Sequence, residues 1–316
     1  MARGITTITT VVQECEAAGA DVRRLVLADE DGWELPPFQP GAHIDLHLAK
    51  GLVRTYSLCN EPRDNARYVI AVKREAESRG GSHFIHDKLE VGSRLGVSLP
   101  RGGMRTGAIG QNIFIAGGIG ITPFLSTIRE MDAAGQTNYQ LHWSCRGEPP
   151  LVENIRDAVE AGRVRIYDTR REPHPDLRAI FAACGPDVHA FCCGPDAMLD
   201  AFEAATAEWP EERRHVERFT APKLASTSNA PPYELVLAQS QKSIMVTPEL
   251  GLLGALDELD ADVPVSCAGG ICGACRTRWV EGQPVHRDRV LSPAEREHEV
   301  IVCVAECASS RLVLDL

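Results

Sequence analysis

Four cysteines near the carboxyl end of the chain restrict its possible folds more than any other feature. Cys267, Cys272 and Cys275 follow a C-x4-C-x2-C spacing, and Cys303 lies 28 positions after the third cysteine. This is the spacing of plant-type [2Fe–2S] ferredoxins, in which each cysteine supplies a thiolate ligand. Structural zinc sites usually pair two short clips instead. One clip of three and one distant cysteine therefore favour an iron–sulfur cluster over zinc or free thiols.

The residues between the first three cysteines are small enough for the backbone to wrap closely around inorganic sulfide, with its N–H groups directed at an anionic cluster. They include Ala268, Gly269, Gly270, Gly273 and Ala274. Cys307, four positions after Cys303, is the alternative fourth ligand. The spacing favours Cys303 and leaves Cys307 as a packing thiol. Eleven cysteines without an export signal do not indicate a disulfide framework.

Length and charge narrow the function further. A chain of 316 residues indicates two or three domains, and a net charge of −11 argues against nucleic acid as a partner. From Ser226 onward there are seven Lys/Arg and thirteen Asp/Glu, which fits either a steering surface for a basic partner or a solvated acidic face. Neither a signal peptide nor a membrane-spanning run is present, so we expect a cytoplasmic protein with no membrane association, and a monomer.

The pattern of apolar residues changes along the chain. Up to about Gly103 it alternates as in an antiparallel β domain, most clearly over Ala42–Leu48. From about Asn112 short apolar strands alternate with helices, one of them expected over Leu151–Ala161, which predicts a doubly wound α/β domain. The polar segment 223–232 has the composition of a linker, and a short α+β unit follows it.

A glycine-rich turn follows the first strand of the α/β segment. Ala116-Gly117-Gly118-Ile119-Gly120-Ile121-Thr122-Pro123 opens a helix, where glycines let a phosphate approach the backbone and a hydroxyl can join it. Gly194-Pro195 forms a second turn after a later strand, and both turns should lie at the carboxyl edge of one sheet. Cys193 at that edge is either a buried strand thiol or a ligand contact.

Two segments of the β domain suit a flavin. Arg54-Thr55-Tyr56-Ser57 combines a cation for phosphate, a flat aromatic ring and two hydroxyls, and Arg79-Gly80-Gly81-Ser82 opens a helix from His83 to Leu89. Taken without any family resemblance, these residues favour a surface turn over a flavin site. His43-x-Asp45-x-His47 is a candidate metal site, but strict alternation favours a solvent-facing strand.

The four motifs occur in the order R-T-Y-S, G-G-I-G-I-T-P, C-C-G-P and C-x4-C-x2-C…C. In this order the whole chain resembles the phthalate dioxygenase reductase group, which includes the vanillate O-demethylase reductases. The resemblance implies an antiparallel FMN-binding β-barrel over 1–104, a doubly wound NAD domain over 105–222, a linker over 223–232 and a β-grasp ferredoxin domain over 233–316. The carboxyl-terminal ferredoxin favours FMN over FAD, and the segment Thr220-Ala221-Pro222 departs from the phthalate enzyme's pattern.

The resemblance also assigns residues to sites. FMN contacts are expected from Arg54, Thr55, Tyr56, Ser57, Ala71, Val72, Lys73, Gly80, Gly81, Ser82 and Phe219, of which Phe219 covers the flavin face. NADH contacts are expected from Gly117, Gly118, Gly120, Thr122, Pro123, Cys193, Gly194 and Pro195. Ser57, Thr122 and Cys193 are expected beside the reacting rings, and Cys267, Cys272, Cys275 and Cys303 around the cluster.

The function implied is that of an NADH-dependent oxidoreductase that feeds a terminal oxygenase of the Rieske type. A reductase for a cytochrome P450 or another monooxygenase is the alternative within the enzymes. A redox-sensing regulatory module is the alternative outside them, although intact flavin and nucleotide motifs argue against it. Asp168 could accept a hydrogen bond from a ribose hydroxyl of NADH, which favours NADH as the donor. Three arginines, Arg146, Arg170 and Arg171, could instead bind the 2′-phosphate of NADPH, so NADPH stays the alternative.

Overall fold

The computed structural model describes residues 7–49, 52–78, 80–106, 110–219 and 231–316, which fall into two compact units. The first unit is Met1–Phe219 and the second is Thr220–Leu316. The expected linker lies outside the described residues except for Pro231 and Pro232, and Arg79 lies outside them as well. None of the helices in the described ranges combines the length and the hydrophobicity that crossing a bilayer requires.

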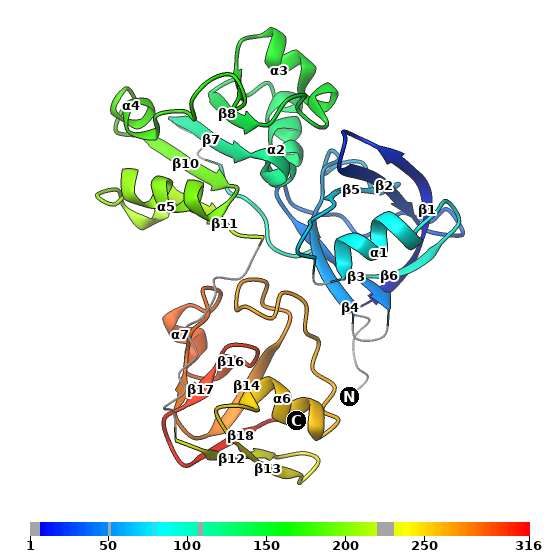
Figure 1. Cartoon of the computed structure of the whole chain (residues 1–316), viewed down its shortest axis with the longest axis vertical. Helices are drawn as coiled ribbons and strands as arrows, with labels where there is room; N and C mark the ends of the chain where they lie inside the picture. The colour runs from blue at the N-terminus through cyan, green and yellow to red at the C-terminus, as the bar shows by residue number, and fades with distance from the viewer. Residues whose placement is uncertain (1–6, 50–51, 79, 107–109, 220–230) are drawn as a thin grey trace. The chain divides into compact units, whose positions relative to one another are not determined.

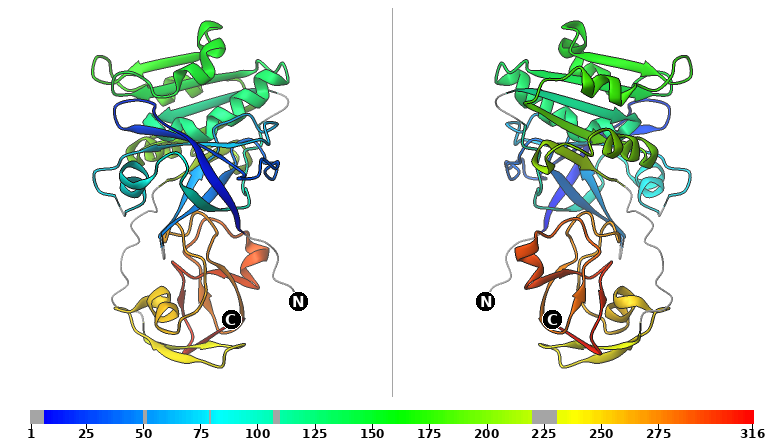
Figure 2. Two further views of the ribbon diagram at one scale, coloured as in Figure 1. Left: turned by 90° about the vertical axis from the view of Figure 1, so that its right-hand side faces the viewer. Right: turned by 90° about the vertical axis from the view of Figure 1, so that its left-hand side faces the viewer.

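The first unit begins with six antiparallel strands in the order β4-β3-β6-β1-β2-β5. The edge strands β4 and β5 contact each other, so the sheet curls into a nearly closed barrel, as predicted (Figures 1 and 2). Alternate residues such as Ile44, Leu46 and Val97 fill its interior. Helix α1 (Gly81–Lys88) contacts β3, β4 and β5. The strands are β1 (Thr7–Ala17), β2 (Val22–Ala28), β3 (His43–Ala49), β4 (Leu52–Ser57), β5 (Tyr68–Lys73) and β6 (Arg94–Ser98).

The second half of this unit is a parallel sheet in the order β11-β10-β7-β8-β9. Helices α2 and α3 cover one face of the sheet, and α4 and α5 the other (Figure 1). Alternation along β7 places Phe114 in the core with α2 and α3, and Ile113 and Ile115 in the core with α4 and α5. The predicted doubly wound fold is therefore confirmed. The elements are β7 (Gln111–Gly117), α2 (Thr122–Ala133), β8 (Tyr139–Cys145), α3 (Arg156–Glu160), β9 (Val164–Asp168), α4 (Leu177–Ala182), β10 (Val188–Cys193), α5 (Asp196–Ala205) and β11 (Arg214–Glu217).

The barrel and the parallel sheet share one apolar core. Val69 and Ala71 of β5 belong to the same buried cluster as Phe124 of α2. The backbone N–H of Gly41 also donates to Ser126 Oγ at 2.9 Å, from the barrel to α2. These contacts explain why the two predicted domains form a single compact unit.

Two local predictions in the α/β segment need correction. The expected helix over Leu151–Ala161 is a 3₁₀ turn, Val152–Ile155, followed by the short α3. Leu151 itself is left-handed, with φ of 61°, and so stands outside any α-helix. The edge strand β11 was not predicted, because Val216 is its single aliphatic residue and provides no alternation.

The second unit is a mixed five-stranded sheet in the order β13-β12-β18-β14-β16, with helix α6 packed on it. Strands β12 and β18 are parallel, whereas their outer neighbours are antiparallel. This α+β arrangement is the predicted ferredoxin fold. Its elements are β12 (Tyr233–Leu237), β13 (Ser243–Val246), α6 (Gly251–Glu258), β14 (Arg276–Glu281), β15 (Pro284–Val285), α7 (Pro293–Arg296), β16 (Glu299–Ile301), β17 (Glu306–Cys307) and β18 (Arg311–Leu314).

A buried carboxylate organises the turn between β15 and α7. The side chain of Asp288 is 1% exposed and accepts the backbone N–H groups of Val290 at 3.1 Å and Leu291 at 2.8 Å. Arg296 lies 3.6 Å from the same carboxylate and donates to the Asp288 carbonyl at 2.9 Å. The next N–H, from Arg289, donates to the carbonyl of Gly270. The Asp288 turn is thereby tied to the cysteine loop.

Asp288→Ala should destabilise the second unit by about 2–3 kcal/mol, because it leaves two buried N–H groups and a cation without their acceptor. Hydrogen exchange of β14 and β18 peptides in the full chain reports the local free energy of unfolding. The matched control is Asp257→Ala on the exposed side of α6. This substitution should change the local free energy of unfolding by less than about 0.5 kcal/mol. Equal protection in the two variants would contradict this role of Asp288.

Candidate functional site

The four predicted cluster cysteines lie together in the second unit. Cys267 contacts both Cys272 and Cys303, and Cys303 also contacts Cys275. Hydrogen bonds from the neighbouring thiols hold the pKa of Cys267 well below its usual range, although burial opposes the shift. The contact with Cys303 lowers the pKa of Cys275 as well. Lowered pKa values favour the thiolate, which is the form that ligates metals.

The backbone around these sulfurs is arranged as a cradle for an anionic cluster. N–H groups of Gly269 and Ile271 bond to Cys267 sulfur, that of Ala274 to Cys272, and that of Gly270 to Cys303. Gly270 has φ of 70°, and a Cβ there would lie 2.8 Å from a methyl of Val304. Only glycine fits this turn, so the loop sequence and its cluster-binding geometry are directly linked.

Cys307 is engaged elsewhere. It is 3% exposed, and its sulfur lies 3.1 Å from Ser309 Oγ and 3.5 Å from the carbonyl of Arg311. It also pairs with Pro284 in the short antiparallel ladder of β15 and β17. These contacts fit the packing role that the spacing assigns to it.

The predicted flavin residues gather where the barrel closes. Arg54 and Tyr56 lie on the edge strand β4, and Ala71, Val72 and Lys73 end the other edge strand, β5. The side chain of Arg54 crosses the start of α1 so closely that a Cβ on Gly81 would lie 2.5 Å from Arg54 Cγ. The guanidinium of Arg54 therefore lies beside the N-terminus of α1, and these two groups together suit the binding of a phosphate.

The side chains of β4 are divided between two environments. Tyr56 is largely buried, and this burial raises the pKa of its phenol. Thr55 Oγ1 instead donates to Asp45 at 2.6 Å, and Arg101 donates to the same carboxylate at 2.6 Å. A flavin contact from Thr55 would therefore use its backbone.

The candidate metal triplet on β3 is not the solvent-facing row that alternation favoured. Asp45 is 5% exposed and is committed to Thr55 and Arg101. Burial, followed by the charge of Arg101, lowers the pKa of His43 to about 4. His47 alone is exposed. Residues from β4 and from the loop after β6 cover this face, which alternation within one strand cannot reveal.

The two glycine turns of the parallel sheet touch each other. A Cβ on Gly117 would lie 2.6 Å from Pro195 Cδ, and a Cβ on Gly120 would lie 2.2 Å from the carbonyl oxygen of Cys193. Thr122 begins α2 and donates to the carbonyl of Ile119 at 3.0 Å. The turns thus form one continuous backbone surface at the carboxyl edge of the sheet, where open α/β folds bind nucleotides.

One residue at this edge escaped the sequence analysis. Glu217 pairs with Cys193 across β10 and β11, and its Oε1 lies 3.5 Å from Ser57 Oγ of the barrel. Desolvation raises the pKa of Glu217 to about 7. Cys193 is fully buried, and burial raises the pKa of its thiol well above the usual value. Ser57, Cys193 and Glu217 therefore meet between the flavin strands and the nucleotide turns.

Asp168 ends β9 at the same edge of the sheet. It accepts the N–H of Gly147 at 2.9 Å and pairs with Arg170 at 3.2 Å and Arg171 at 3.5 Å. The Arg170 hydrogen bond, and then that of Gly147, lower the pKa of Asp168 to about 2. A permanent negative charge therefore stands at this strand end.

Phe219 is the last residue of the first unit and is 42% exposed, which is unusual for a phenyl ring of this chain. It follows Glu217 by two positions and so lies directly beyond β11. Its exposure leaves the ring available for the flavin contact that the family resemblance predicts, and that contact stays a prediction.

Comparisons with known proteins agree with this geometry. Residues 236–308 match the family of 2Fe–2S iron–sulfur cluster binding domains. The phthalate dioxygenase reductase of Burkholderia cepacia is 35% identical over 306 residues, which cover 95% of each chain. The vanillate O-demethylase oxidoreductase of a Pseudomonas species is 34% identical over 98% of this chain and 100% of its own.

Solved structures give the same result. A phthalate dioxygenase reductase, described as a modular structure for electron transfer from pyridine nucleotides to [2Fe–2S], aligns over 98% of both chains with 33% identity and a TM-score of 0.73. An intact type IV self-sufficient cytochrome P450 monooxygenase aligns over 98% of this chain and 41% of its own, with 33% identity and a TM-score of 0.85. On these full-length matches, the chain belongs to the phthalate dioxygenase reductase family.

Proposed function

We propose that this chain is the reductase component of a Rieske-type aromatic-ring oxygenase or O-demethylase system. It takes electrons from NADH and delivers them singly to the terminal oxygenase, with FMN and a [2Fe–2S] cluster as its redox centres. The observation that carries this proposal is the cysteine cradle at 267–275, present in one chain with the phosphate-ready start of α1 and the paired glycine turns. Relatives named as reductases of phthalate and vanillate systems support the same assignment.

The need for two redox centres follows from electron counting. NADH gives up two electrons together as a hydride, whereas a [2Fe–2S] cluster accepts one electron at a time. A bound flavin supplies the chemistry that connects these two kinds of carrier. The protein contributes the orientation of the reacting rings and the electrostatic environment around them.

The residues between the flavin strands and the nucleotide turns set that environment. Burial favours the neutral thiol of Cys193, and Glu217, with a pKa of about 7, is half charged near pH 7 and mostly neutral one pH unit below. Ser57 offers a hydroxyl between them. A pocket with little fixed charge suits a nicotinamide and a flavin ring that must stack closely, while Thr122 and the glycine turns hold the dinucleotide.

NADH is the preferred donor in this proposal. Arg170 and Arg171 are both paired with Asp168, and Glu172 Oε1 accepts the Asp168 N–H at 3.1 Å, so two carboxylates offset the two guanidinium charges at the strand end where an adenosine ribose would lie. The Asp168 carboxylate, with its pKa of about 2, accepts from a 2′-hydroxyl and repels a 2′-phosphate.

The partner is an oxygenase with a basic docking face. The acidic excess from Ser226 onward steers such a partner toward the cluster-bearing unit. A haem monooxygenase is the second candidate, because a self-sufficient P450 contains a closely similar segment. We further propose a monomer in the cytoplasm, where a reducing environment keeps the cluster cysteines available.

Cys272→Ser should abolish NADH-driven cytochrome c reduction, lowering it at least about tenfold, while ferricyanide reduction survives because it draws on the flavin. Steady-state rates with the two acceptors test this. Cys307→Ser is the matched control and should leave both rates unchanged. If Cys272→Ser kept both activities, the cluster would not lie on the path.

Glu217→Gln should flatten the pH dependence of stability. The pKa of Glu217 rises from 4.5 to about 7 on folding, so its stabilising contribution is complete below pH 4.5 and is lost as the pH rises through 7. The variant should gain about 2 kcal/mol, or several degrees in Tm, at pH 8 relative to pH 5.5. Glu208→Gln, at an exposed position, should not. Parallel melting profiles for the two variants would contradict the raised pKa.

Asp168→Asn should lower the ratio of kcat/KM for NADH to that for NADPH by about tenfold, because the repulsion of a 2′-phosphate is removed. Asp157→Asn, on the exposed side of α3, is the control with the same chemical change. A wild-type chain that prefers NADPH, or an unchanged ratio in the variant, would show that Asp168 does not select the nucleotide.

A further inference from the structure

Helix α1 is the element that would hold the flavin phosphate, and it cannot maintain its own position. It has eight residues, Gly81–Lys88, and begins after Gly80, which has φ of 90°. A helix this short is marginal by itself, so its direction depends on contacts with the barrel. The first N–H groups of any helix have no partner inside it, and here they adjoin Arg54.

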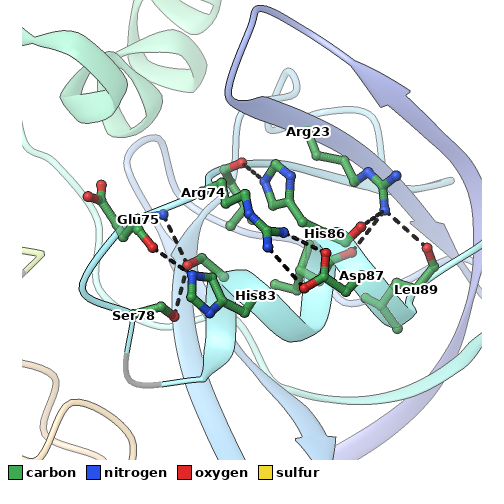
Figure 3. A network of polar contacts seen from close by, with 11 residues as sticks. Arg23, Arg74, Glu75, Ser78, His83, His86, Asp87 and Leu89 are labelled. Carbon is green, nitrogen blue, oxygen red and sulfur yellow. Dashed lines mark hydrogen bonds and ion pairs between the residues drawn. The ribbon is translucent and has the colours of Figure 1, made fainter.

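The carboxyl end of α1 is fixed by one cation. Arg23 of β2 donates from Nη1 to the carbonyls of Ile85 at 3.0 Å, His86 at 2.9 Å and Leu89 at 3.2 Å (Figure 3). A positive charge at the last turn complements the helix dipole and satisfies carbonyls that would otherwise face no donor. Arg23 thus sets the position of the end opposite to the phosphate.

The side of α1 is fixed to the strand that should carry the flavin ring. His86 Nε2 lies 2.9 Å from the carbonyl oxygen of Val72, and because a carbonyl only accepts, Nε2 carries the proton (Figure 3). Arg23 and Val72 are directly opposite each other in the register of β2 and β5. The two anchors therefore converge on one position of the barrel, at the end of β5.

Further bonds tie the start of α1 to the loop after β5. The N–H of Glu75 donates to Ser82 Oγ at 3.2 Å, and the ring of His83 bonds the Glu75 carbonyl at 2.9 Å (Figure 3). Arg74 and Asp87 form a two-point ion pair, but both side chains are more than 40% exposed, so this pair contributes little. Arg23 and His86 are half-buried, so their bonds contribute more to this network than the exposed ion pair does.

We propose that Arg23 and His86 are positioning residues for the flavin phosphate. They fix α1 against β5 so that the distance from the ring-binding strand to the helix N-terminus matches a flavin that carries a ribityl phosphate. Neither side chain touches the ligand; both act through the helix. The inference rests on the proposed flavin site and predicts a specific consequence, which is selection of FMN over riboflavin.

The test compares two ligands that differ only in the phosphate. The full-length chain, stripped of flavin, is titrated with FMN and with riboflavin, and binding is followed by flavin fluorescence. Arg23→Gln should raise the Kd for FMN about tenfold, since a small displacement of α1 weakens the phosphate contacts. The Kd for riboflavin should change less than about twofold, because the ring contacts lie on β4 and β5.

Four further variants separate positioning from general stability. Arg23→Lys keeps the cation and should recover part of the FMN affinity. His86→Gln keeps an N–H donor toward Val72 and should bind FMN more tightly than His86→Phe. Arg24→Gln is the matched control, because Arg24 is adjacent on β2 but pairs with Glu14 and Glu16 instead; it should leave both affinities unchanged.

The outcomes are distinct. Equal weakening of FMN and riboflavin in Arg23→Gln would mean that Arg23 only supports the barrel, and unchanged affinities would mean that α1 needs no anchor; either result overturns the proposal. If the wild-type chain bound riboflavin as tightly as FMN, the chain would have no phosphate-binding site at α1, and the proposal that FMN is the cofactor would be contradicted as well.

Discussion

The apolar core shared by the barrel and the parallel sheet determines where this chain can pass a hydride. Ala71 belongs to that core and is also one of the residues expected against the flavin, so packing and cofactor position are set by the same strand. The same packing brings Ser57 of the barrel to 3.5 Å from Glu217 of the edge strand. A substitution that loosened this core would therefore move the flavin ring and the nicotinamide ring apart even if every residue that binds them were unchanged.

How much the sequence could predict depended on whether the geometry is local. The cysteine spacing and the glycine turns encode short loops, and the structure forms those loops as expected. Glu217 could not be found in this way, because its partner Ser57 lies 160 positions away and its strand shows no alternation. The anchoring of α1 by Arg23 is equally non-local, since the bonded residues are more than 60 positions apart.

Burial was the property that the sequence predicted least well. Alternation correctly identified the strand around Asp45, but it could not show that Arg101 and Thr55 cover its outer face. Conversely, the glycines of the cysteine loop are expected at the cluster because they lie between its predicted ligands, and Gly270 proves to be required by the closeness of Val304. The sequence predicts a position well where local geometry allows only one residue type, as at Gly270. It predicts burial poorly where segments distant in the chain cover a side chain, as they do at Asp45.

The division into two units has a consequence for electron transfer. The proposed flavin and nucleotide sites lie in the first unit, and the proposed cluster cysteines lie in the second, each with its own core. Electrons must therefore leave one unit for the other, whereas the hydride step takes place entirely within the first.

The order of events can be measured directly by mixing the oxidised holoprotein with NADH without oxygen, in a rapid-mixing experiment that follows flavin absorbance and freeze-quenched cluster signals. Flavin bleaching should precede cluster reduction, and removal of the flavin should prevent reduction of the cluster by NADH. Cluster reduction that kept its rate in flavin-free protein would contradict it.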